Sequence, residues 1–234
     1  MKKKVLAIAL AVVLIAIMVS GTLAYFTAED EVTNTFTIGS VEIDLWENGV
    51  EAGETMSMGQ LIPVVGSDPT KETDNYQLKA VQVKNTGLNP AYVEVFIAVP
   101  KVLDDAGVLK LMDNYPNDET YGWTNLGKAG EMTQGTVAYN VYKYRYSTAL
   151  NAGVITDEAI EYVYINSEAD IDVTRDANGT ITAAYFTMGD TTVDFNVAAM
   201  ALDVYVASWA IQSEGFETAE SALSTFGKAH PWAN

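Results

Sequence analysis

The chain has 234 residues, and 31 acidic against 13 basic residues give it a formal charge of −18. It contains no cysteine and a single histidine, which excludes disulfides, thiolate metal sites, thiol nucleophiles and a histidine-rich metal site. The acidity argues against nucleic acid as a partner, because phosphate binding needs lysine and arginine patches. Apolar residues make up 49 %, which is enough for a real core in one or two domains.

Residues 1–24 have the pattern of an export signal. Three lysines at positions 2–4 precede an unbroken apolar run at 5–19, shorter than the ~20 residues that a membrane span needs. Small residues at Thr22 and Ala24 fit a signal-peptidase site, so we expect cleavage between Ala24 and Tyr25 during export. An uncleaved anchor is the alternative. Cleavage would change the charge from −18 to −21, because three lysines leave.

Alternation of apolar and polar residues dominates the rest of the chain and predicts an all-β fold. Valine, isoleucine, tyrosine and phenylalanine recur at every second position, as half-buried strands require. Asn178-Gly179 marks a hairpin turn between two of these segments. The predicted strands cover 41–45, 93–99, 137–145, 160–164, 171–173, 181–185, 193–197 and 200–206.

One short helix is predicted near 218–226. Four apolar residues from Ala219 to Phe226 have helical spacing, Thr218 is a suitable N-cap and Gly227 a suitable stop. Many short strands followed by one late helix are typical of a β-sandwich or jelly roll. We therefore predict a jelly-roll-like β-sandwich over 41–234.

Two stretches, 53–75 and 101–134, are polar and interrupted by proline and glycine. We expect loops there, with a short helix near 102–112. Trp123 falls in the second loop and is expected to be exposed, whereas Trp46 and Trp209 are expected at the edge of the core.

The segment after the signal carries the most specific pattern. Tyr25-Phe26 is followed by a polar stretch and then by Phe36-Thr37-Ile38-Gly39-Ser40-Val41-Glu42-Ile43. Together with Asn85-Thr86-Gly87 before Pro90-Ala91-Tyr92-Val93, and with Ala210–Phe216, this pattern resembles the TasA/camelysin family, which is secreted through a dedicated signal peptidase. The resemblance implies a jelly-roll subunit of a surface or biofilm-matrix fibre. Its partners would be copies of itself, bound through the N-terminal strand, and other matrix components.

The arm, residues 25–40, supports the same idea through its side chains. Val32, Phe36 and Ile38 share one face, and the apolar phase shifts at Gly39, where we expect a bulge or a hinge. Burying each of the three side chains gives about 1.5–3 kcal/mol, while ordering the backbone costs roughly 1–2 kcal/mol per residue. The arm, which begins with Tyr25 and Phe26, therefore needs a preformed groove, and donating it to a neighbouring copy grows a filament. The alternative is an ordinary first strand paired within its own sheet.

Enzymatic function has little support in the sequence. Camelysin-type relatives are described as metalloproteases, yet no His-Glu-x-x-His motif occurs, and we expect His230 on an exposed C-terminal tail. We expect no cofactor, although Asp170, Asp172 and Asp176 could hold calcium loosely. A solvated acidic hairpin is the other interpretation. The tyrosines from Tyr139 to Tyr146 occur on both strand faces, which favours sheet packing over a carbohydrate surface.

These features predict a secreted structural protein of the cell surface or biofilm matrix. A monomeric secreted β-sandwich that binds carbohydrate or a cell-surface partner is the alternative, and a camelysin-like metallopeptidase ranks third. The acidity predicts that assembly improves with salt, divalent cations or acid.

Overall fold

The computed structural model describes residues 27–30, 40–53, 76–112, 122–196 and 203–233. Within these ranges most residues lie in antiparallel sheets and one short helix lies near the C-terminus, which confirms the predicted all-β class. No helix among the described residues is long and apolar enough to cross a membrane. The predicted signal peptide lies outside them. So do these residues of the predicted donor strand and its hinge: Tyr25, Phe26, Val32, Phe36, Ile38 and Gly39.

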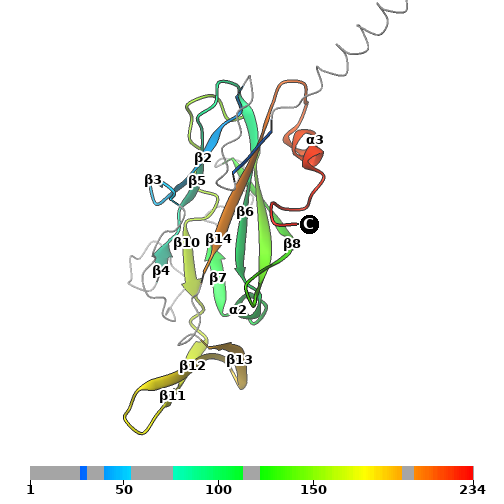
Figure 1. Cartoon of the computed structure of the whole chain (residues 1–234). Coiled ribbons are helices and arrows are strands. Elements are labelled where there is room, and N and C mark those ends of the chain that lie inside the picture. The colour runs from blue at the N-terminus through cyan, green and yellow to red at the C-terminus, as the bar shows by residue number, and fades with distance from the viewer. Residues whose placement is uncertain (1–26, 31–39, 54–75, 113–121, 197–202, 234) are drawn as a thin grey trace, which may run out of the picture.

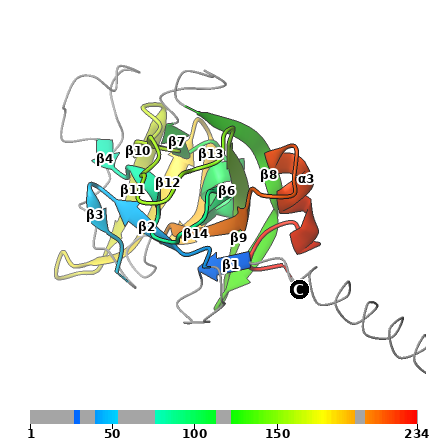
Figure 2. The ribbon, with the colours of Figure 1, turned by 90° about the horizontal axis from the view of Figure 1, so that it is seen from above.

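The largest sheet has five strands and forms the middle layer of the molecule (Figures 1 and 2). Its spatial order is β1 (Thr27–Asp30), β14 (Tyr205–Gln212), β6 (Ala91–Pro100), β9 (Val137–Tyr146) and β8 (Trp123–Gln134). β6 occupies the centre, and all but its second residue are buried, as expected of a strand covered on both faces.

A second layer of two small sheets covers one face of the five-stranded sheet (Figure 2). One contains β3 (Val50–Glu51), β2 (Ile43–Glu47) and β5 (Val81–Asn85), and the other contains β4 (Tyr76–Leu78), β10 (Tyr162–Ile165) and β7 (Leu109–Met112). The main core lies between the layers, where Val83 and Val163 join Val95 and Ile97 of β6 in one buried cluster. Alternate β6 residues face this core, because successive strand side chains point to opposite faces.

The opposite face of the five-stranded sheet is covered by the C-terminal segment, with α3 (Ala219–Leu223) and the 3-10 turn η2 (Ser224–Phe226) (Figure 2). Trp209 is the centre of this second core. Its ring stacks on Phe226 at 4.3 Å and meets Phe96 edge-on at 4.8 Å. Thr218 Oγ1 accepts the backbone N–H of Ser221 at 3.1 Å, as predicted for an N-cap, and Gly227 ends the turn at φ 68°.

A fourth sheet projects from the lower end of the molecule (Figure 1). It consists of β11 (Ala169–Arg175), β12 (Ile181–Met188) and β13 (Thr191–Asn196). The predicted hairpin turn at Asn178-Gly179 is confirmed, and Gly179 has the positive φ of 83° that such a turn needs.

The predicted loop at 101–134 is wrong in large part. It contains strand β7 and the twelve-residue strand β8. The short helix predicted near 102–112 is confirmed in part, as the single-turn helix α2 (Lys101–Asp105). Trp123 begins β8 and is 4 % exposed, so its predicted exposure is wrong as well. Its indole Nε1 donates a hydrogen bond to the backbone oxygen of Asp157 at 2.7 Å, which satisfies the buried N–H.

Candidate functional site

The outer edge of β14 is the part of the structure that bears most directly on assembly. β14 pairs with β6 along its whole length on one side, from Tyr205 to Gln212. On the other side it pairs with β1 from Ser208 to Ile211. On this side, residues 205–207 pair with no strand among the described residues. The strand contains no charged residue, and Ser208–Ile211 are all buried. An uncharged edge of this kind is a template for another strand.

β1 is a small element held in place by this edge. Its four residues pair antiparallel with β14, from Thr27 opposite Ile211 to Asp30 opposite Ser208. Ladder hydrogen bonds contribute roughly 0.5–1.5 kcal/mol each, and fixing each residue costs about 1–2 kcal/mol. These contributions nearly cancel for so short a strand. Within a single chain this part of the arm is thus paired with its own sheet, as the alternative interpretation of the sequence held.

The other edge of the five-stranded sheet is protected in several ways. β8 carries Lys128 and Glu131, and its register against β9 shifts at Asn125 and again before Gly130. Charged residues and bulges of this type hinder the addition of another strand. The two edges therefore differ, and β14 is the one open to strand addition.

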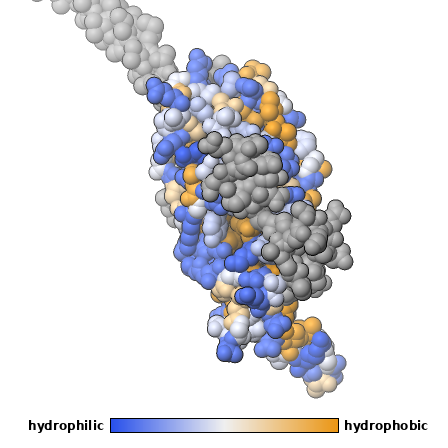
Figure 3. Space-filling model, turned by 180° about the vertical axis from the view of Figure 1, so that it is seen from behind, coloured by the Kyte–Doolittle hydropathy of each residue, from blue (hydrophilic) through white to orange (hydrophobic). Residues whose placement is uncertain are grey.

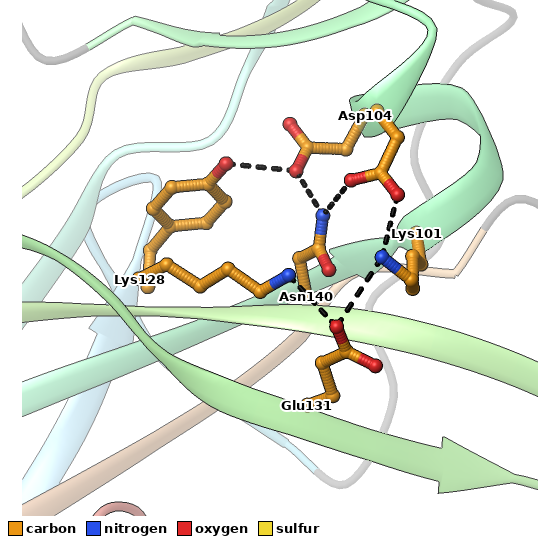
Figure 4. A network of polar contacts seen from close by, with 7 residues as sticks. Lys101, Asp104, Lys128, Glu131 and Asn140 are labelled. Carbon is orange, nitrogen blue, oxygen red and sulfur yellow. Dashed lines mark hydrogen bonds and ion pairs between the residues drawn. The ribbon is translucent and has the colours of Figure 1, made fainter.

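A polar network ties α2 to the sheet beneath it (Figure 4). The Asn140 amide Nδ2 donates to Asp104 Oδ2 at 2.5 Å and to Asp105 Oδ1 at 2.7 Å, and the Tyr142 hydroxyl donates to Asp104 Oδ2 at 2.7 Å. Lys101 Nζ lies 2.5 Å from Asp105 and 3.2 Å from Glu131. All the partners lie on α2, β8 or β9, so the network fixes the helix to two strands.

The ion pairs set the charge states within this network. The hydrogen bond from Lys101 lowers the pKa of Asp105 below its usual value, and the hydrogen bond from Lys128 lowers that of Glu131. Burial raises the pKa of the Tyr142 hydroxyl, and its bond to Asp104 adds to the effect. The carboxyls of Asp105 and Glu131 are ionised and the Tyr142 phenol is neutral at neutral pH, an arrangement that suits a structural clamp.

An open cleft of about 590 Å³ lies beside this network, between α2, the start of β9 and β13. Val102, Val137 and Val193 form part of its apolar lining, and Lys101 and Asp194 are among its charged residues. Among the described lining residues the one aromatic side chain is Phe195, which is 2 % exposed.

His230 was expected on an exposed tail, and that expectation is wrong. The residue is 3 % exposed, and its ring lies against Gly130 of β8, where a Cβ would be 2.8 Å from Nε2. Burial lowers the pKa of the imidazole, although a hydrogen bond with the backbone of Glu131 acts in the opposite direction. Nδ1 is buried and makes no hydrogen bond within the described part of the chain. The C-terminal segment is therefore part of the second core.

The aspartates considered for calcium are strand and turn residues of the projecting sheet. Asp170 and Asp172 lie on β11, and Asp176 Oδ1 accepts the backbone N–H groups of Asn178 at 2.8 Å and Thr180 at 2.9 Å. Among the described residues no group of three histidine, cysteine, aspartate or glutamate side chains is placed to hold a metal ion. Loose calcium binding stays a prediction.

The tyrosines of β9 pack within the fold. Tyr139 faces the second core, whereas Tyr142, Tyr144 and Tyr146 face the main core. The predicted occurrence on both strand faces is confirmed, and packing accounts for these rings.

No protein-family model, curated protein or solved structure matches this chain. The relation to the TasA/camelysin family thus stays a prediction based on the residues quoted above. The β14 edge was not predicted as a site, although its eight uncharged residues were a usable signal in the sequence.

Proposed function

We propose that this protein is a secreted structural subunit of a surface or biofilm-matrix fibre, with a jelly-roll-like fold and a cleaved signal peptide at 1–24. Copies polymerise head to tail when the N-terminal arm, residues 25–40, leaves its own sheet and pairs with β14 of the next copy. The four-residue contact of β1 with the uncharged β14 edge is the observation that carries this proposal.

The pairing of β1 with β14 in a single chain is the state from which strand exchange between copies would start. In an unassembled copy, β1 shields half of the β14 edge. In a fibre, the same segment of a neighbour would take this place, and the rest of the incoming arm would extend along residues 205–207. Exchanging one strand for an identical one requires little free energy beyond opening the short β1 ladder.

Two chains that differ only in the arm test the proposal. We expect the chain beginning at Tyr25 to form filaments in electron micrographs and to elute as large species in size exclusion. The chain beginning at Gly39 should unfold cooperatively in urea yet stay small. Equal assembly by both chains would refute arm donation.

A peptide of residues 25–40 gives the matching gain-of-function test. It should bind the chain that begins at Gly39, and the same peptide with Phe36→Ser and Ile38→Ser should bind at least tenfold more weakly. If both peptides bind equally, the apolar anchors are not those proposed.

The competing functions give different results in the same preparation. A monomeric binding module would remain monomeric with or without the arm. A metallopeptidase would degrade casein, and a chelator would abolish the activity.

A further inference from the structure

The cleft between α2, β9 and β13 lies at the lower end of the five-stranded sheet, away from the contact of β1 with β14. Figure 1 shows α2 and β13 at this end of β6. In the space-filling view, hydrophobic surface reaches the same end of the described body (Figure 3). The cleft volume of about 590 Å³ is within the roughly 300–1,000 Å³ of sites that enclose small ligands. A recess of this size has room for two apolar side chains.

The lining of the cleft suits an uncharged, apolar segment. Lys101 and Asp105 form an ion pair with each other, which leaves Asp194 as the other charged group among the described lining residues. Residues 32–40 of the arm contain no charged side chain, so the cleft would not repel them. Four apolar residues of the lining belong to the main core or pack against it: Val102, Val137, Val193 and Phe195.

The register of β1 indicates where a longer incoming arm would lie. If the arm of another copy continued along β14 in this register, Thr33 would be opposite Tyr205. The same row crosses β6 at Ala98 and β9 at Val141. Positions on the arm and on β9 can therefore be compared along one direction of the sheet.

Beyond this row, the arm would approach the cleft. Arm residues 36–38 follow Thr33 by three to five positions, and the cleft residues 136–138 of β9 precede Val141 by the same number. The nearest of these cleft residues is about 10 Å further along and, across three strand spacings, about 14 Å to the side. Five extended residues, from Thr33 to Ile38, span about 17 Å. The arm is thus long enough to reach the cleft.

The same register turns the apolar face of the arm toward the cleft. Val32 would be opposite Val206, which packs against the main core. Phe36 and Ile38 follow Val32 by four and six positions, so in an extended strand all three side chains point to the same face. The cleft is lined by residues of that core. Length and side-chain direction therefore agree.

Chain length also decides which arm can enter the cleft. Ser40, the last residue of the arm, accepts the backbone N–H of Leu88 at 3.0 Å, close to the first residue of β6. The cleft lies past the other end of this ten-residue strand, about 30 Å away. Phe36 precedes Ser40 by four residues, which span at most about 14 Å. A chain cannot place Phe36 or Ile38 in its own cleft, whereas the arm of a second copy can enter it.

We propose that the cleft between α2, β9 and β13 receives Phe36 and Ile38 from the arm of a neighbouring copy. This inference rests on the proposed function and assigns it an acceptor site. It also supplies a driving force, because these two side chains can be buried in the cleft only after exchange between copies. The contact joins the Ser40 end of one copy to the α2 end of the next, so it does not close on itself.

The absence of cysteine permits a cross-linking test on the purified protein. Copies with Ile38→Cys are mixed with copies with Ala138→Cys, an exposed position of the cleft, and the filaments are oxidised. In the control mixture, Leu126→Cys, exposed near the other end of β8, replaces Ala138→Cys. We expect the 38–138 disulfide to form in at least fivefold higher yield than the 38–126 disulfide. Equal yields would overturn the proposal.

A double variant tests whether a second copy is required. Protein with both Ile38→Cys and Ala138→Cys is oxidised, once in dilute unassembled form and once as filaments. We expect a ladder of covalent multimers from the filaments on a denaturing gel and no 38–138 link in the dilute chains by mass spectrometry. A link within single dilute chains would mean that the arm reaches its own cleft, and the proposal would be wrong.

Blocking the cleft tests its role in growth. Ala138→Glu adds a charge and a longer side chain to the lining, so filament growth should slow at least tenfold, whereas Leu126→Glu should grow normally. Cooperative urea unfolding of both variants checks that they are folded. Equal growth of the two variants would show that the arm does not use the cleft.

A mixture of complementary variants links the cleft to the arm anchors. Copies with Phe36→Ser and Ile38→Ser keep an intact cleft, and Ala138→Glu copies keep an intact arm. An equimolar mixture should therefore give discrete dimers that grow no further. A mixture without dimers would mean that the two sets of substitutions do not act on one contact.

The results distinguish this inference from the proposed function. If filaments depend on the arm but the 38–138 link does not exceed its control, the cleft assignment is wrong and the proposed function stands. If removal of the arm leaves filament growth unchanged, arm donation is wrong and the cleft assignment fails with it.

Discussion

At the scale of single residues, His230 makes the C-terminal segment sensitive to acid. Burial lowers its pKa below the ordinary 6.5, so below that pH the unfolded chain takes up a proton that the folded chain does not. The stability that depends on the neutral ring is complete above pH 6.5 and is lost as the pH falls. We expect the free energy of unfolding in urea to drop from pH 7.5 to 5.5, and His230→Gln to reduce this drop. An identical drop in the variant would show that other groups cause it.

Asn85 gives a second prediction at this scale. Its side chain makes three hydrogen bonds with buried or partly buried backbone groups. Asn85→Ala leaves those groups without partners, and we expect a loss of about 2–4 kcal/mol in the free energy of unfolding. Asn178→Ala, at an exposed position of the hairpin turn, is the control and should change it by less than about 0.5 kcal/mol. A small effect at Asn85 would mean that this amide does not hold the turn 85–91 and the segment 147–156 together.

The sequence could not reveal either residue's role. The burial of His230 depends on Gly130, a hundred positions earlier, because the missing side chain leaves room for the ring. By contrast, Thr218 and Gly227 were predictable, since a cap and a stop act on neighbouring residues of the same segment. Local signals were therefore sufficient for the helix, and contacts between distant segments were not.

At the scale of elements, the strength of the alternation decided which strands could be predicted. β6 and β9 have long apolar runs on one face and were predicted. β8 was missed, because Trp123 and Met132 are the two buried residues among its twelve, and half of the positions between them hold glycine or a charged residue. An edge strand with half of its surface in water carries little period-2 signal.

The attachment of α2 gives a prediction at the scale of elements. A five-residue helix is too short to be stable alone, so its position depends on the Asn140 clamp. Asn140→Ala removes two hydrogen bonds to carboxylates, and we expect a loss of about 2 kcal/mol together with faster amide exchange in α2. Lys128→Ala, which removes a largely solvated ion pair, should cost less than about 1 kcal/mol. Equal losses in the two variants would contradict a specific role for Asn140.

At the scale of the whole molecule, the net charge opposes the association that arm donation favours. Copies with a charge of −18, or −21 after removal of the signal, repel each other over the ~10 Å screening length of 0.1 M salt. Added salt screens the repulsion between copies but does not weaken the burial of apolar side chains. We therefore expect the minimum concentration for filament growth, measured by light scattering, to fall several-fold between 20 and 300 mM NaCl at pH 7.5. Micrographs would confirm that the scattering comes from filaments. A higher minimum concentration at 300 mM would mean that ion pairs between copies hold the fibre together. The uncharged β14 edge would then not be its principal contact.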